Sequence, residues 1–237
     1  ALGLGDLFDQ PLLKLLHQFE EAKNFGSLIQ PCLDERTIAF VRDAIAAKDL
    51  GGQLFLRETH LKVLLVLEQA EALTQRYHVV VANPPYMTRG MNAQLATLLK
   101  STFHSSQSDL SATFITRSRQ LCIEIGLCGL VTMHSWMFLS KLEEFRKELI
   151  EACSIITLVH HGIGAFPTLN SKIVQTVAFV IVTARRTNIR GSYLNLSNVS
   201  PTLNKETLFQ DRLISKDSFY SIHLRDLVGV PGNPIAY

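Results

Sequence analysis

Four consecutive residues have the types and order needed to hold an amino nitrogen while it is methylated: Asn83, Pro84, Pro85 and Tyr86. An exocyclic amine is a weak nucleophile because its lone pair is delocalised into the ring. Acceptors on its hydrogens, here the Asn83 side-chain carbonyl and the Pro84 carbonyl, favour a more tetrahedral nitrogen, which is catalysis by positioning and electrostatics. The prolines stiffen the loop and the Tyr86 ring can stack on a planar base. The spacing therefore predicts a rigid amine clamp at residues 83–86.

The element that must position this clamp is the apolar run 77–82, which predicts a strand. Val79, Val80 and Val81 are typical of a fully buried strand of a parallel sheet, and ligands of open α/β sheets bind outside the carboxyl ends of strands. Pro-Pro also commonly marks the end of a strand, so the tetrapeptide alone leaves an ordinary strand exit as an alternative. The predicted location favours the clamp.

Further motifs, in order and spacing, resemble adenine-specific DNA methyltransferases, in particular the large PglX-like methyltransferases of BREX phage-defence systems. The similarity covers about residues 77–184 and includes, after the clamp and Met87, the segments Gly90-Met91-Asn92, Asp109-Leu110 leading to Phe114, Ser135 to Leu139 with Phe145-Arg146, Gly162 to Pro167, and the strand Val174 to Val180. Phe25 to Leu28 adds a further piece of the same pattern.

This resemblance implies an α/β, Rossmann-like S-adenosylmethionine-dependent methyltransferase fold, present here as the carboxyl-terminal half of its sheet. It also implies methyl transfer to the exocyclic amine of an adenine flipped out of double-stranded DNA. Carried over by position, residues 83–86 hold and stack the adenine, Phe166 stacks on its other face, and Phe114 packs against the adenine ring of the cofactor. A core aromatic at a strand end for Phe166, and a core helical position for Phe114, stay open as alternatives.

One departure from the family concerns the cofactor. The family binds S-adenosylmethionine through a glycine-rich turn after its first strand and an acidic residue after its second, both upstream of the clamp. The glycines of 2–6 and 50–52 do not follow a strand-like run and lack the context of a nucleotide loop. We therefore expect the chain to be a segment of a longer enzyme, inactive alone, with DNA contacted mainly through regions outside it.

Two other functions remain open. The clamp would equally serve a methyltransferase that acts on a protein glutamine amide or an RNA guanine, although Phe166 and the long carboxyl-terminal continuation favour a DNA base. The missing cofactor loop instead suggests a noncatalytic, methyltransferase-like scaffold that binds other proteins of a defence complex.

Composition indicates a folded α/β domain with appendages, because 47% of the 237 residues are hydrophobic and 19% are charged. A net charge of +2 gives no strong field for attracting a phosphate backbone. The basic cluster 185–190 is expected to be solvated surface, with phosphate contact as the alternative.

The cysteine pattern and the hydropathy bear on the cellular compartment of the protein and on whether it binds a metal ion. The four cysteines show no CxxC spacing and the sequence has no apolar run long enough to cross a membrane, and we expect no secretory leader. We expect a soluble cytoplasmic protein without zinc. His160 and His161 are adjacent on a predicted strand and would point to opposite faces, so no metal site is predicted.

Periodicity predicts a helical segment at 1–76, a catalytic half-domain at 77–186, and a linker or the start of a DNA-recognition region at 187–237. We expect helices at 7–22 with Pro11 in the first turn, at 34–48 capped by Asp34, at 54–76, and at 109–125 capped by Asp109. Further strands are expected at 129–133, 155–159, 174–182 and 193–196, and those at 155–159 and 174–182 should pair antiparallel.

Two regions suggest hypotheses, one about a moving loop and one about self-association of the chain. Residues 87–108 form a long connection beside the clamp, which suggests a lid over the substrate. The strand ending at Ala82 lacks the neighbours that the family places beside it, so its edge should be open or covered by residues 1–76. An open edge would promote self-association.

Overall fold

A computed structural model of the chain describes residues 6–48, 54–165, 174–186, 188–199, 204–216, 219–227 and 230–235. The chain divides into two compact units, Ala1–Arg76 and Tyr77–Tyr237. Phe166 lies outside the described residues. Of the glycine-containing segments 2–6 and 50–52, only Asp6 is described.

The first unit contains only helices among its described residues: α1 (Asp6–Gln18), α2 (Ala22–Phe25), the 3-10 turn η1 (Gly26–Leu28), α3 (Glu35–Ala46) and α4 (Leu54–Thr74). The predicted cap is confirmed, because Asp34 Oδ1 accepts the Thr37 amide at 2.9 Å. The expectation for Pro11 was wrong. α1 already includes Asp6, so Pro11 lies inside the helix, where it cannot donate the amide hydrogen bond of its turn.

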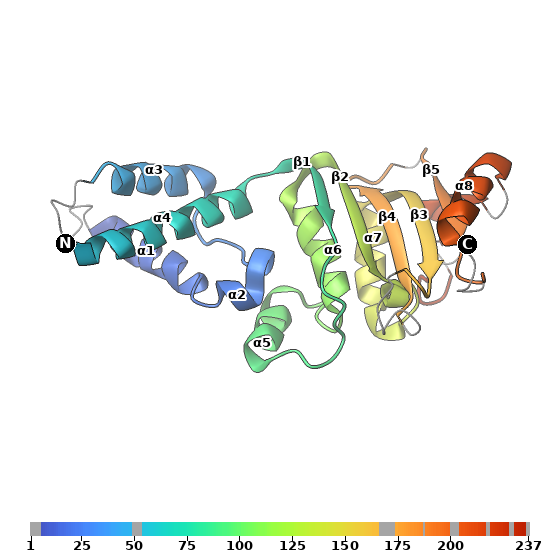
Figure 1. The fold of residues 1–237 in the computed structure, drawn as a ribbon, viewed down its shortest axis with the longest axis horizontal. Helices are drawn as coiled ribbons and strands as arrows, with labels where there is room; N and C mark the ends of the chain where they lie inside the picture. Colours follow the sequence, from blue (N-terminus) through green and yellow to red (C-terminus); the bar gives the residue numbers. More distant parts are fainter. Residues whose placement is uncertain are drawn as a thin grey trace. The chain divides into compact units, whose positions relative to one another are not determined.

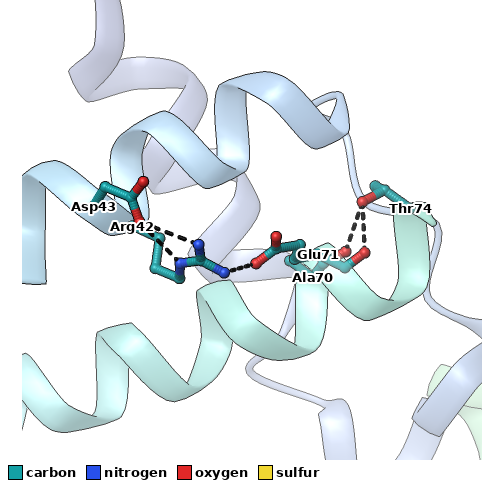
Figure 2. Close-up of polar contacts among 5 residues, drawn as sticks. All are labelled: Arg42, Asp43, Ala70, Glu71 and Thr74. Atoms are coloured by element: carbon teal, nitrogen blue, oxygen red, sulfur yellow. Dashed lines mark hydrogen bonds and ion pairs between the residues drawn. The ribbon is translucent and has the colours of Figure 1, made fainter.

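Apolar side chains at helical spacing form the core of this unit. Leu15, Ile38 and Leu67, from α1, α3 and α4, are completely buried. Figure 2 shows the polar link across the outside of this core, where the Arg42 guanidinium bonds both Asp43 and the Glu71 carboxylate. α3 and α4 are thus joined by an apolar seam and an ion pair.

The second unit is built on a six-stranded sheet with strand order β1-β2-β4-β3-β5-β6 (Figure 1). The strands are β1 (Tyr77–Ala82), β2 (Cys122–Met133), β3 (Ser154–Gly162), β4 (Thr176–Val182), β5 (Arg190–Asn195) and β6 (Phe219–His223). β1 and β2 are parallel, as are β3 and β5, whereas β4 is antiparallel to both β2 and β3. The carboxyl ends of β1, β2, β3 and β5 therefore meet at one edge, and the predicted antiparallel pair is confirmed.

Helices connect the parallel strands. α5 (Ala93–Thr102) and α6 (Leu110–Leu121) lie between β1 and β2, and the turns η2 (His134–Met137) and η3 (Ser140–Leu142) precede α7 (Glu143–Ala152) between β2 and β3. One face of the sheet packs on α6 and α7 through the buried side chains of Ile115, Trp136, Phe145, Leu158 and Phe179. This is the predicted α/β class.

Three expectations about elements in this unit were wrong in detail. Residues 87–108 contain α5, whose Leu95 and Leu99 are buried, so the connection is partly helical. The helix after Asp109 ends at Leu121, and β2 begins at once with an irregular stretch before its regular pairing from Leu127. The helix ends because Cys122 adopts an extended backbone, with φ −82° and ψ 152°, and Ile125 further along has a positive φ of 67°, which a helix excludes.

The burial of β1 also differs from expectation. Val79 is 57% exposed and Val81 is 78% exposed, so the strand is not fully buried. In the part of the chain that the structure describes, β1 pairs with β2 alone. Its position at the edge of the sheet, with α6 against one face, explains the exposure of the other face.

After Arg186 the chain continues the sheet with β5 and β6 and adds α8 (Lys205–Ser215) and α9 (Leu224–Leu227). Ile235 is completely buried in the core beneath the sheet, and its amide donates to the Met137 carbonyl at 3.0 Å. What the segment 187–237 recognises stays a prediction. No helix among the described residues is both long and apolar enough to cross a membrane.

Candidate active site

The proposed clamp leaves the sheet directly at the carboxyl end of β1. Pro84 is buried, Asn83 and Pro85 are exposed, and Tyr86 is half-buried. The Tyr86 hydroxyl donates to Asn83 Oδ1 at 3.0 Å. Burial raises the pKa of Tyr86, so the phenol keeps its proton and remains a donor. Because an amide oxygen has two lone pairs, Asn83 can accept a second hydrogen bond from an amine.

The clamp is attached to α6 through the residue that follows it. The Leu110 amide donates to the Met87 carbonyl at 3.0 Å. Asp109 caps α6, with Oδ1 accepting the Ser111 amide at 2.9 Å, which confirms the predicted cap. Phe114 lies one turn further along the same helix and is partly exposed, whereas its neighbour Ile115 is completely buried.

A contact between Asp109 and Ser135 joins α6 to the exit of β2. Ser135 Oγ donates to Asp109 Oδ2 at 2.6 Å. The sequence marked both residues as parts of one family pattern, but nothing in their spacing shows that they touch. The structure thus brings the exits of β1 and β2 together at the start of α6.

A cluster of rings at the same edge was not anticipated. His134, after β2, and His160, at the end of β3, lie with Nδ1 and Nε2 3.0 Å apart, and the Phe138 ring packs against both. Burial lowers the pKa of His134. Burial, with the charges of His134, Lys205 and His161, lowers the pKa of His160 to about 4. The histidines are therefore neutral at pH 7 and bring no positive charge to the site.

The exit of β3 is held in place from α8. Lys205 Nζ donates to the His161 carbonyl at 2.5 Å and to the Ile163 carbonyl at 2.6 Å. Gly162 has φ +71°, and a Cβ at that position would lie 2.7 Å from the Ser197 Cα. Only glycine fits this close approach, which gives a packing reason for the glycine in this motif. The loop that continues toward Phe166 thus starts from a fixed base.

A hollow of about 410 Å³ lies over the open face of the sheet next to the clamp. It extends from Asn83 and Val81 across Gly129 to Val159. The lining is mostly aliphatic. This arrangement leaves the clamp beside an apolar surface on one side and the start of α6 on the other.

The basic cluster that follows β4 lies away from the clamp. The exposed Arg185 and Arg186 follow β4, which runs antiparallel to β1, so they lie at the opposite edge of the sheet. This position does not favour phosphate contact beside the clamp. Among the described residues, no three His, Cys, Asp or Glu side chains gather as a metal ion would require.

The sequence of this chain matches a known family of methylases. The profile of the Eco57I restriction-modification methylases matches residues 18–166, which is more than half of the chain. The chain belongs to the Eco57I restriction-modification methylase family. Membership in this methylase family implies the use of S-adenosylmethionine, and the resemblance to adenine-specific methyltransferases is confirmed.

Two curated relatives are adenine-specific methyltransferases. BrxX from Escherichia coli O9:H4 (strain HS) is 36% identical over 99% of this chain and 20% of its own length. PglX from Lacticaseibacillus casei (strain Zhang) is 30% identical over 95% of this chain and 19% of its own length. This Eco57I-family chain therefore spans about a fifth of the length of these relatives.

Solved structures show the same fold at low sequence identity. A type I restriction-modification system matches with a TM-score of 0.51 and 15% identity, over 74% of this chain and 44% of that chain. A nuclease-deletion mutant of the Type ISP restriction-modification enzyme LlaGI, in complex with a DNA substrate mimic, matches with a TM-score of 0.53 and 12% identity, over 84% of this chain and 17% of that chain. The predicted α/β methyltransferase fold is confirmed.

Proposed function

We propose that this chain is part of an adenine-specific DNA methyltransferase, which transfers methyl from S-adenosylmethionine to the exocyclic amine of a flipped adenine in DNA modification or phage defence. The observation that carries this proposal is the Asn83 carbonyl, held by Tyr86 at the carboxyl end of β1, in a chain of the Eco57I family. The clamp residues stand where an open α/β sheet places its ligands.

The chain's own residues would act by positioning. Asn83 Oδ1 and the Pro84 carbonyl accept the two amine hydrogens, and the buried Pro84 keeps that carbonyl in a fixed direction. The Tyr86 ring supports one face of the extracted base, and Phe166 is proposed for the other. No side chain needs to act as a strong base, because the nitrogen becomes cationic as the new bond forms and its proton is then acidic enough to pass to water.

The described residues fit part of the cofactor. When bound, S-adenosylmethionine supplies an activated methyl group on a sulfonium. Phe114, partly exposed on α6 near the clamp, offers a ring for the cofactor's adenine. In the described part of the first unit only helices precede β1, so a strand followed by a glycine-rich turn is not seen there. We infer that the main binding loop belongs to a part of the enzyme outside this chain.

DNA is the proposed substrate and partner. The net charge of +2 is small, and the arginines after β4 lie at the opposite edge of the sheet, while one exposed arginine, Arg89, follows Tyr86 by three residues. DNA affinity would therefore come mainly from the rest of the polypeptide. Proteins of a phage-defence system are proposed as further partners on the basis of the relatives named BrxX and PglX.

The test uses the longest natural polypeptide that contains this chain. Transfer of labelled methyl from S-adenosylmethionine is measured on genomic DNA from a strain lacking the enzyme, on RNA and on total protein. We expect N6-methyladenine in DNA, and loss of at least about 100-fold of the rate in Asn83→Ala. Asn198→Ala, an exposed asparagine of the same unit, is the matched control and should keep the rate.

The outcomes separate the alternatives. Label in a protein glutamine or an RNA guanine, with none in DNA, would show that the methyl acceptor is one of these alternatives and not adenine in DNA. Calorimetric titration of S-adenosylmethionine into both the 237-residue chain and the long polypeptide tests the cofactor inference. Binding to the long polypeptide alone would agree with it, and binding to neither would favour a noncatalytic scaffold.

A further inference from the structure

The Asp109 side chain connects two segments beside the clamp, the start of α6 and the exit of β2. This side chain is completely buried. Oδ1 accepts the amides of Ser111 and Ala112 at 2.9 and 3.4 Å, and Oδ2 accepts the Ser135 hydroxyl at 2.6 Å. One carboxyl group therefore both caps α6 and fastens the start of that helix to the exit of β2.

The fastened end of α6 carries the amide that holds the clamp loop. Leu110, the first residue of α6, donates its amide to the Met87 carbonyl at 3.0 Å, and Met87 directly follows Tyr86. A shift of the α6 start would move this donor and, through Met87, the clamp itself. The helix start is also anchored on its other side, because Thr113 Oγ1 donates to the Ser106 carbonyl at 3.0 Å.

We propose that Asp109 is a positioning residue for methyl transfer, acting through Leu110 and Met87 to set the place of the Asn83 carbonyl. The inference rests on the proposed function. Capping α6 needs only one oxygen of the Asp109 carboxylate. The other oxygen accepts the hydroxyl of Ser135, which is 26 residues away in sequence. Catalysis by positioning is sensitive to such supports, since a displacement of about 1 Å can cost on the order of 100-fold in rate.

The test compares Asp109→Ser with Ser135→Ala in the long polypeptide. Serine is a good helix cap, but its shorter side chain cannot also reach Ser135. The control is Asp34→Ser, which makes the same replacement at the exposed cap of α3. The measurements are the single-turnover rate of methyl transfer at saturating S-adenosylmethionine and DNA, the KM values, and the unfolding midpoint.

We expect Asp109→Ser and Ser135→Ala each to lower the single-turnover rate by roughly 10-fold or more, with KM values within about threefold of the unsubstituted enzyme. The double variant should lose little more than either single one, because both changes remove the same bond. Asp34→Ser should keep its rate within about twofold, because the Asp34 side chain bonds Thr37 of its own helix in the first unit.

Three results would overturn the inference. Asp109→Ser could keep the full rate, the two rate losses could multiply in the double variant, or the loss could disappear on cooling in step with recovered folding, which would indicate a purely structural role. A different result marks failure of the proposed function: the unsubstituted enzyme would transfer no methyl to adenine, and the inference would then fall with it.

Discussion

Arg146 and Gly232 are joined by two hydrogen bonds although they lie 86 residues apart: Nε and Nη2 of the arginine donate to the glycine carbonyl at 3.1 and 2.6 Å. The same guanidinium, only 1% exposed, donates to the carbonyls of Asn233, Trp136 and Leu139. The segment 230–235 is thereby held against the turn that follows β2.

Removing this guanidinium should destabilise the fold. In Arg146→Met several buried carbonyls would lose their donor, and we expect a loss of about 2–4 kcal/mol in the free energy of unfolding. The free energy of unfolding of Arg146→Lys should lie between those of Arg146→Met and the unsubstituted chain, because an ammonium keeps the charge but not the planar fork of the guanidinium. Urea unfolding of the 237-residue chain measures both.

The matched control for Arg146 is Arg185→Met, which removes an exposed arginine of the same unit. Its unfolding free energy should change by less than about 0.5 kcal/mol. Equal urea midpoints for Arg146→Met and Arg185→Met would show that the buried contacts contribute nothing to stability.

The hydrogen bond between Tyr86 and Asn83 should contribute to the rate of methyl transfer. Tyr86→Phe removes the donor to Asn83 Oδ1 but keeps the ring, so methyl transfer should fall by roughly 10-fold. Tyr86→Ala also removes the stacking face and should fall by a further 10-fold or more. The rates are measured in the long polypeptide, with Tyr220→Phe on β6 as the control. If Tyr86→Phe and the unsubstituted enzyme are equally fast, the hydroxyl does not align Asn83.

Local signals in the sequence predicted several of the elements around the candidate site correctly. The valine run before Asn83 fixed β1, and Asp34 and Asp109 were recognised as caps because capping depends on neighbours in the chain. The contacts of Asp109 with Ser135, and of Arg146 with Gly232, join residues far apart, and their spacing carries no information about which partner each will meet. The burial of β1 was overestimated for the same reason, since it depends on what lies beside the strand.

Acidification should weaken the fold through His160. Its pKa in the folded chain is about 4, below the ordinary 6.5, because the protonated ring would be buried beside other bases. Between these values His160 binds more protons in the unfolded chain than in the folded chain, so its contribution to stability rises with pH from about 4 to 6.5 and is constant above. Lowering the pH from 7 to 4.5 should cost about 1–3 kcal/mol from this group.

The measurement for His160 is urea unfolding at a series of pH values. His160→Gln cannot titrate in this range, so its stability should fall less steeply between pH 6.5 and 4.5. His104→Gln, at an exposed turn, is the control and should keep the slope of the unsubstituted chain. An unchanged slope in His160→Gln would contradict the lowered pKa.

The edge of β1 that pairs with no other strand among the described residues should make the 237-residue chain associate with itself. Val81 is 78% exposed on a strand that, among the described residues, pairs on one side only, and such edges pair readily with other copies. A lysine at this position should oppose pairing, because two copies would bring like charges together in a partly apolar contact. Sedimentation velocity over a range of concentrations should show Val81→Lys associating at least about 10-fold more weakly than the unsubstituted chain.

Ile214→Lys separates this edge effect from a general gain in charge. Ile214 is 84% exposed on α8, so its replacement adds the same charge at a distance from β1. Association should persist in Ile214→Lys and be weak in Val81→Lys. In the long polypeptide we expect further strands to pair with β1, and there Val81→Lys should disturb folding instead of association. Equal association of the two variants would show that copies meet through another surface, and the proposal that β1 awaits neighbours from the rest of the enzyme would lose its support.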